Sequence, residues 1–268
     1  MRLLRALALA AVLLPLHTPA PRAQDADDCV LDECAGEAPD AAPNSSAPDA
    51  GGAVPLPAPA SPDQTFTARR GPRGASGVAG DFDFYVLALS WSPSFCRTPA
   101  GERAQDQCAP GAGLGFVTHG LWPQYERGYP QYCRFGAPTP SRIALAQAAG
   151  VYPSEGLARH EWRAHGVCSG KSPTDYFADV RRARALVTIP PAFASPQGDQ
   201  SWARLDIERA FLAANPRLRP GMMGIACRRS ALAEMRICLT KDLRDFRACP
   251  EVARPACPPD AILAPGPL

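Results

Sequence analysis

The residues best suited to acid–base chemistry are histidines, and they are concentrated in two short segments. The sequence has four histidines, and three of them, His119, His160 and His165, lie in FVTHGLWP and ARHEWRAHGVC. The fourth, His17, lies near the N-terminus. Because the unperturbed pKa of imidazole is about 6.5, one histidine can accept a proton and another can donate one near neutral pH. The two segments therefore predict an acid–base pair made of His119 and His165.

Glu161 and His165 have the spacing of neighbours on one face of a helix. Their separation of four residues places them about 40° apart around the helix axis. A carboxylate beside an imidazole favours the protonated imidazole, so the spacing predicts that Glu161 orients His165 and raises its pKa. An ordinary surface pair would have the same spacing, and this pair alone does not separate the two interpretations.

The same segment does not fit a metal site. The zinc-protease pattern HExxH places its histidines at positions i and i+4. His160 and His165 are instead five residues apart, which separates them by about 140° around a helix. The cysteines do not fit either, because no two of them have the C-x-x-C spacing. We therefore expect no metal and no other cofactor.

Cleavage of RNA is a reaction that suits two histidines without a metal. The ribose 2′-hydroxyl is an internal nucleophile beside the phosphorus. The enzyme supplies a base for this hydroxyl, an acid for the 5′ leaving oxygen and positive charge for the phosphate. His119 and His165 can be base and acid in either order, and His160 or Arg163 can hold the phosphate. The nearby aromatic side chains that can stack on a base are Trp122 and Tyr129.

Three segments of the sequence resemble those of the ribonuclease T2 family. HGLWP and HEWRAHGVC look like its two signature segments, and DFYVLALSWSPSFC resembles its first core strand. The order and the spacing agree, and the resemblance extends from Phe82 to about Pro258. It implies an endoribonuclease that needs no metal, cleaves single-stranded RNA by 2′-hydroxyl transesterification with low base specificity, and leaves 2′,3′-cyclic phosphate ends.

The resemblance also implies a role for individual residues of the two segments. His119 matches the catalytic histidine of the first segment, and Glu161 and His165 match the catalytic pair of the second. His160 matches a histidine that binds phosphate in some members, and Trp122 matches a residue that stacks on a base.

The chain departs from the family pattern at three positions. The second segment usually reads EWxKHGTC, but Ala164 replaces the lysine and Val167 replaces the threonine. In the family the lysine helps to stabilise the transition state, and Ala164 cannot take this role. The neighbouring Arg163 lies about 100° away around a helix, on a different face. Gln124 stands where some members have an aspartate that contacts the base, and we keep it as a candidate substrate-binding residue.

Two other classes of protein compete with this interpretation. A catalytically weakened RNA-binding protein on the same fold is favoured by Ala164, whereas the intact His119, Glu161 and His165 argue against it. A metal-dependent hydrolase is disfavoured by the spacing of its candidate ligands.

The elements that must position these residues can be read from apolar patterns. Strand-like runs cover residues 82–91, 115–122, 222–227 and 231–239. Helical patterns cover residues 141–150, 154–166, 174–186 and 206–214. Ser154 is a candidate N-cap of the helix that carries the second segment. The sequence predicts one α+β domain in which helices pack on a central antiparallel sheet, stapled by disulfides.

The ten cysteines of the chain predict disulfides, because their number is even and the chain is expected to be exported. The sequence alone leaves their pairing open. The resemblance implies the pairs Cys96–Cys108, Cys133–Cys168, Cys227–Cys257 and Cys238–Cys249, and it leaves Cys29 and Cys34 as a remainder.

The N-terminal part of the chain differs in composition from the rest. Residues 1–23 combine Arg2 and Arg5, an apolar run after them and terminal small residues, as a signal peptide does. Residues 24–80, rich in Ala, Pro and acidic residues, predict a disordered spacer. Residues 81–268 then form the T2-like catalytic domain, whose modest basic excess suits RNA as a partner. We expect a secreted or periplasmic monomer that does not insert into a membrane.

Overall fold

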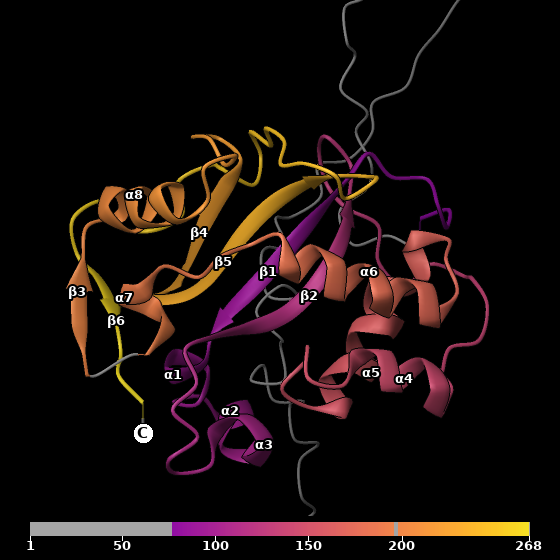
Figure 1. Cartoon of the computed structure of the whole chain (residues 1–268), viewed down its shortest axis with the longest axis horizontal. Helices are drawn as coiled ribbons and strands as arrows, with labels where there is room; N and C mark the ends of the chain where they lie inside the picture. The colour runs from indigo at the N-terminus through magenta and orange to yellow at the C-terminus, as the bar shows by residue number, and fades with distance from the viewer. Residues whose placement is uncertain (1–76, 196–197, 268) are drawn as a thin grey trace, which may run out of the picture. The chain divides into compact units, whose positions relative to one another are not determined.

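The computed structural model describes residues 77–195 and 198–267. Within these residues the chain has the predicted α+β fold, with a sheet at its centre and helices packed against it (Figure 1). The predicted signal peptide (1–23), most of the predicted spacer (24–80) and the pair Cys29–Cys34 lie outside the described residues.

Four strands form the antiparallel part of the sheet, in the order β2-β1-β5-β4. Their bounds are β1 Phe84–Trp91, β2 Phe116–Gln124, β4 Met223–Arg228 and β5 Ala231–Thr240. Each overlaps a strand that the apolar runs predict. β2 lies at the end of this order, and helix α5 (Glu155–Ala164) packs against it.

Two short strands extend the sheet beyond the four predicted ones. β3 (Gln200–Trp202) pairs antiparallel with β6 (Ile262–Ala264), and β6 joins β5 through one parallel pair, Ala231 with Leu263. The sheet is therefore mixed at this point rather than antiparallel throughout. A parallel neighbour requires a long crossover connection, and residues 241–261 provide it between β5 and β6.

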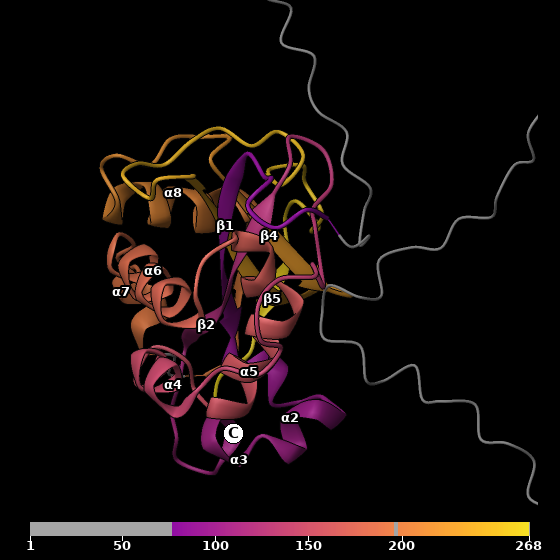
Figure 2. The ribbon, with the colours of Figure 1, turned by 90° about the vertical axis from the view of Figure 1, so that its right-hand side faces the viewer.

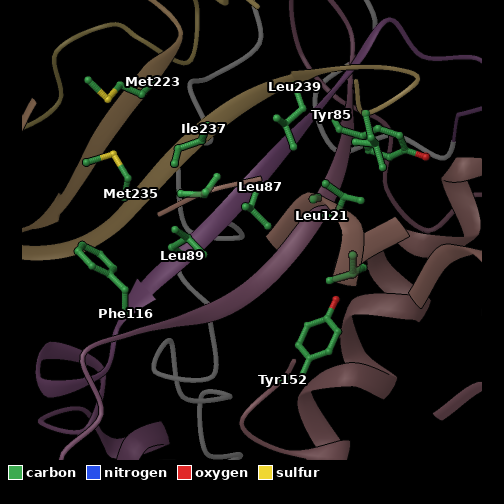
Figure 3. Close-up of a cluster of buried hydrophobic side chains, with 14 of the residues drawn as sticks. Tyr85, Leu87, Leu89, Phe116, Leu121, Tyr152, Met223, Met235, Ile237 and Leu239 are labelled. Atoms are coloured by element: carbon green, nitrogen blue, oxygen red, sulfur yellow. The ribbon is translucent and has the colours of Figure 1, made fainter. Parts of the chain in front are cut away.

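Strand β1 is buried on both faces, which explains its continuous apolar sequence. On one face, Leu87 and Leu89 belong to the large apolar core shared with the helices (Figure 3). On the other face, Val86 and Ala88 form a smaller cluster with Trp122. The first face supplies most of the apolar burial, and the second lies next to the histidines.

The longer helices lie where the sequence predicts them. They are α4 (Arg142–Ala148), α5 (Glu155–Ala164), α6 (Pro173–Ala185) and α8 (Arg204–Ala214). The shorter ones are α1 (Ser92–Phe95), α2 (Pro99–Arg103), α3 (Gln105–Cys108), α7 (Pro191–Ala194) and the 3₁₀ helix η1 (Gly166–Ser169). Figure 2 shows α6, α7 and α8 on the same side of β1. Among the described residues, no helix combines the length and the apolar composition that crossing a membrane requires.

Four disulfides cross-link the described residues. They are Cys96–Cys108, Cys133–Cys168, Cys227–Cys257 and Cys238–Cys249, the same pairs that the resemblance implies. The second joins the segment after β2 to η1, and the last two fasten β4 and β5 to the C-terminal segment.

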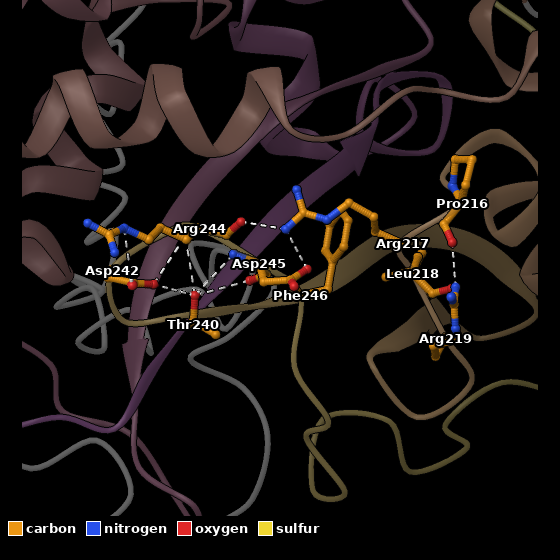
Figure 4. Close-up of polar contacts among 9 residues, drawn as sticks. All are labelled: Pro216, Arg217, Leu218, Arg219, Thr240, Asp242, Arg244, Asp245 and Phe246. Atoms are coloured by element: carbon orange, nitrogen blue, oxygen red, sulfur yellow. Dashed lines mark hydrogen bonds and ion pairs between the residues drawn. The ribbon is translucent and has the colours of Figure 1, made fainter.

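The turn that follows β5 is fixed by polar contacts (Figure 4). The Thr240 hydroxyl donates to Asp242 Oδ1 at 2.6 Å and accepts the backbone N–H of Asp245 at 3.2 Å. Arg217, from the segment before β4, pairs with Asp245 at 2.8 Å. After this turn the chain runs back toward β5, and the disulfide between Cys238 and Cys249 joins the two segments.

Candidate active site

His119 occupies a bulge in strand β2. The register of β2 against β1 shifts between Ala88 and Leu89, so that His119 has no partner in β1. In a regular strand, His119 would face the same side as Leu121, toward the large core. The extra residue turns it instead to the face that carries Trp122, and the two ring centroids lie 5.2 Å apart.

Gly120, beside His119, leaves room for the helix that completes the site. A Cβ at this position would overlap Glu161 Oε2 and Trp122 Nε1, two atoms joined by a 2.8 Å hydrogen bond. Any side chain here would displace that pair. The glycine of the HGLW segment is therefore required by the close approach of α5 to β2.

Helix α5 brings Glu161 to β2. Its buried carboxylate accepts the indole N–H of Trp122 at one oxygen, and its other oxygen lies 3.5 Å from His119 Nε2. The prediction that Glu161 orients His165 is therefore wrong about the partner. The reason is that α5 ends at Ala164, and His165 leaves helical geometry with φ −123°, so the helix spacing no longer fixes the direction of its side chain.

Strand β5 contributes two charged residues that the sequence interpretation missed. Glu234 Oε1 lies 2.6 Å from His119 Nδ1, and Arg236 Nε donates to Glu234 Oε2 at 2.7 Å. Burial raises the pKa of the Glu234 carboxyl, but Arg236 and His119 outweigh this effect and lower its pKa to about 2. The available signal was the alternation of β5, which places a carboxylate and a guanidinium on one face of a buried strand.

His165 also lies next to Trp122, with ring centroids 5.1 Å apart. Burial lowers the pKa of His165 well below 6.5, and the positive charges of His119, His160 and Arg236 lower it further, while Glu234 opposes them. Within the described residues, its buried Nδ1 has no hydrogen-bond partner. The prediction of a raised pKa is therefore corrected: His165 is held in its neutral form.

The two histidines thus have opposite electrostatic surroundings. His119 lies between the carboxylates of Glu161 and Glu234, which favour a protonated ring. His165 lies in a buried position facing positive charges, which favour a neutral ring. Two titratable groups whose surroundings favour opposite protonation states form an arrangement that general acid–base chemistry can use.

The three candidate base-binding residues differ in how open they are. Trp122 is 2% exposed, so little of its ring can stack on a base in this structure; it contacts both histidines and Glu161 instead. Gln124 is buried at the end of β2, and its amide donates to the carbonyl of Pro123. Tyr129 is partly buried in the segment after β2.

The two candidate phosphate-binding residues lie on α5. His160 is partly exposed, and its charge acts on His165. Arg163 is exposed in the last turn of α5. In the part of the chain that the structure describes, no three His, Cys, Asp or Glu side chains are grouped so that they could hold a metal ion.

The Cys133–Cys168 disulfide fastens the end of α5. Tyr132, before the first cysteine, donates its N–H to the carbonyl of Ala164 at 2.8 Å. Cys168 donates its N–H to the carbonyl of His165 at 2.9 Å. Tyr132 therefore holds Ala164 directly, and the disulfide ties the segment after β2 to Cys168, whose N–H holds His165.

The sequence of the chain is similar to those of known proteins. Residues 82–249 match the model of the Ribonuclease T2 family. A ribonuclease of Aeromonas hydrophila is 39% identical over 205 residues, which cover 70% of this chain and 88% of the relative. Ribonuclease I of Escherichia coli (strain K12) is 28% identical over 173 residues, which cover 49% of this chain and 65% of the relative.

Solved structures share the fold. A mutant of RNase MC1 in complex with 5′-GMP is similar with a TM-score of 0.52 and 25% identity, over 68% of this chain and 100% of that chain. RNase NT in complex with 5′-AMP is similar with a TM-score of 0.52 and 23% identity, over 68% of this chain and 97% of that chain.

Proposed function

Since the chain belongs to the ribonuclease T2 family, whose members are endoribonucleases, we propose that it cleaves single-stranded RNA through attack of the ribose 2′-hydroxyl on the adjacent phosphate. The reaction leaves a 2′,3′-cyclic phosphate and a 5′-hydroxyl and uses no metal. The observation that carries the proposal is the pair of histidines around Trp122, one among carboxylates and the other facing positive charges.

We assign the base to His165 and the acid to His119. Neutral His165 accepts the proton of the 2′-hydroxyl while the bond from O2′ to phosphorus forms. Protonated His119 gives its proton to the 5′ oxygen while the bond from phosphorus to that oxygen breaks. The protons balance, because the base ends protonated and the acid ends neutral.

We assign phosphate binding to His160 and a supporting role to Glu161 and Trp122. His160 is partly exposed, and its positive charge lies near His165. The buried Glu161–Trp122 pair holds the face of β2 against α5 and keeps a carboxylate beside His119. We also propose low base specificity, because Gln124 directs its amide to Pro123.

The proposal is tested by incubating purified protein with single-stranded RNA in excess EDTA and analysing the ends of the fragments. We expect cleavage that EDTA does not reduce, with 2′,3′-cyclic phosphate ends, and cleavage that is slower by about 10²–10⁴-fold in His119→Ala or His165→Ala. Cleavage that EDTA abolishes would contradict the proposal in favour of a metal-dependent hydrolase.

The second candidate is an RNA-binding protein with weakened catalysis on the same fold. Ala164 favours it, because its small, buried side chain supplies no positive charge where the family usually has a lysine. Binding of RNA by wild-type protein without cleavage in the same assay would support this candidate and reject the first.

We further propose that the protein is exported, to the periplasm or the medium, after removal of residues 1–23, and that it acts as a monomer. The composition of that segment and the disulfides of the folded part support export. N-terminal sequencing of the protein from each cell fraction tests the first point, and sedimentation equilibrium tests the second.

A further inference from the structure

The Glu234–Arg236 pair on β5 has no role in the acid–base assignment above, but Glu234 contacts His119, the proposed acid. Glu234 is fully buried, 115 positions from His119 in the sequence, and its Oε1 lies 2.6 Å from His119 Nδ1. Its other oxygen accepts the Nε–H of Arg236 at 2.7 Å. A buried carboxylate with both oxygens committed to charged or polar partners is a built contact rather than a surface pair.

The geometry decides which nitrogen of His119 carries a proton in the neutral ring. A carboxylate only accepts hydrogen bonds, so the 2.6 Å contact requires a proton on Nδ1. The proton that the acid exchanges must then be the one on Nε2, the nitrogen on the side of α5. A hydrogen-bond acceptor at one ring nitrogen of a catalytic histidine fixes its tautomer and leaves the other nitrogen for proton transfer.

We propose that Glu234 is a positioning residue of this enzyme, which holds the Nδ1–H of His119 so that Nε2 delivers the proton to the leaving oxygen of RNA. Arg236 supports it by keeping the Glu234 carboxylate ionised. The proposal rests on the acid role that we assign to His119.

The surroundings of His119 support this role over a purely structural one. The groups that face the ring are Glu234 from β5 and Glu161 from α5, and the further charges near them are Arg236 and His165. Glu161 already accepts the indole N–H of Trp122. Glu234 is placed at Nδ1, so its carboxylate can determine the tautomer.

The test compares Glu234→Gln and Glu234→Asp with wild type, and uses Glu208→Gln as a matched control. Glu208 forms an ion pair with Arg204 on α8, outside the proposed site. The probe is polyuridylic acid, with kcat and KM measured across pH. In parallel, ring ¹⁵N spectra of the histidines report their tautomers, with His119 assigned from a His119→Ala sample.

We expect Glu234→Gln to lower kcat at least about tenfold with little change in KM, as is typical when the partner of a working histidine is lost. The limb of the pH profile that requires protonated His119 should move to lower pH, because the ring loses an anionic neighbour. The Nδ1–H tautomer of His119 should lose its dominance. Glu234→Asp should recover part of kcat, and Glu208→Gln should match wild type.

Three results would overturn the proposal. One is a Glu234→Gln enzyme with the kcat, pH profile and His119 tautomer of wild type. Another is a loss of kcat with unchanged tautomer and pH limb and a lower unfolding temperature, which would mean that Glu234 only stabilises the fold. The third is a further loss when Glu234→Gln is added to His119→Ala, since a residue that acts through His119 has no effect without it.

The spectra separate this inference from the proposed function. If wild-type protein does not cleave RNA, the proposed function fails, while the tautomer of His119 in wild type and in Glu234→Gln still decides whether Glu234 controls it. If Glu234→Gln does not fold, the same measurements on Glu234→Asp decide, because a carboxylate one methylene farther from Nδ1 should weaken both the Nδ1–H preference and kcat.

Discussion

The two faces of strand β1 carry different kinds of burial. One face packs Leu87 and Leu89 into an apolar core that contains many aromatic rings. The other face, one residue out of phase along the strand, adjoins His119 and the fully buried Glu234. Burying a charged group costs free energy unless partners offset it. The first face therefore stabilises the fold. The second face lowers the free energy of unfolding, because it keeps charged groups buried away from water.

The difference between the two faces shows where substitutions should separate activity from stability. On the helix-covered face we expect substitutions to affect stability first. On the His119 face we expect effects on proton transfer, with smaller changes in the free energy of unfolding.

The largest expected effect is that of removing either histidine. We predict that His119→Ala and His165→Ala each lower kcat by about 10²–10⁴-fold, the usual contribution of a general acid or base. Circular dichroism should show a folded protein in both cases, because the apolar core is untouched. Near-normal activity of either variant would reject the two-histidine mechanism.

The second prediction concerns the disulfide that joins the two sides of the site. Loss of Cys133–Cys168 in the double variant Cys133→Ser/Cys168→Ser should lower the free energy of unfolding by about 2–5 kcal/mol and also lower kcat. The matched variant Cys96→Ser/Cys108→Ser should lower stability alone, because that pair joins α1 to α3 away from the histidines. Denaturant unfolding and initial rates on RNA make the comparison. Equal losses of kcat in the two variants would contradict it.

The third prediction is a smaller loss for Glu161→Gln than for either histidine variant, about tenfold in kcat. The amide can still accept the indole N–H of Trp122, but it removes a negative charge beside His119. The pH limb that moves should be that of the acid, His119, toward lower pH. A shift confined to the His165 limb would contradict this prediction, and would mean that Glu161 acts on His165, as the helix spacing predicts.

The smallest effect concerns pH. Because the pKa of His165 is lowered, the acidic limb of kcat/KM should lie below pH 6.5, where the base remains neutral. His160→Gln should move this limb slightly upward, since one positive neighbour is lost. The sign for stability is related: below about pH 6.5 the unfolded chain binds the His165 proton more readily than the folded one. The free energy of unfolding should therefore fall as pH falls through this range. A limb at or above pH 6.5 would contradict the assignment of His165 as a neutral base.

The sequence predicts the elements of the site better than the contacts between them. Strand β2, helix α5 and its serine N-cap at Ser154 follow from local patterns, and Ser154 accepts the N–H of Leu157 in the structure. The short elements α1 to α3, α7, β3 and β6 were not predicted, because segments of three to five residues are formed by tertiary packing rather than by their own propensity.

Two further features of the site could not be obtained from local patterns. The bulge at His119 depends on the register against β1, and the pairing of Glu234 with His119 spans 115 positions. The helix spacing of Glu161 and His165 was misleading for a local reason, since it assumes that the helix continues past Ala164. Side-chain partners across strands and at helix ends depend on three-dimensional positions that periodicity does not specify.

The long separation between His119 and Glu234 has a consequence for the timing of activity. β1 lies between β2 and β5 in the sheet, so the contact exists only after β1 has paired on both sides. Contacts between distant parts of a chain form late and slowly. A chain in which β5 has not yet paired with β1 therefore lacks this contact even if helix α5 has formed. The last rise in kcat during refolding should coincide with the closing of the sheet rather than with the appearance of helix α5.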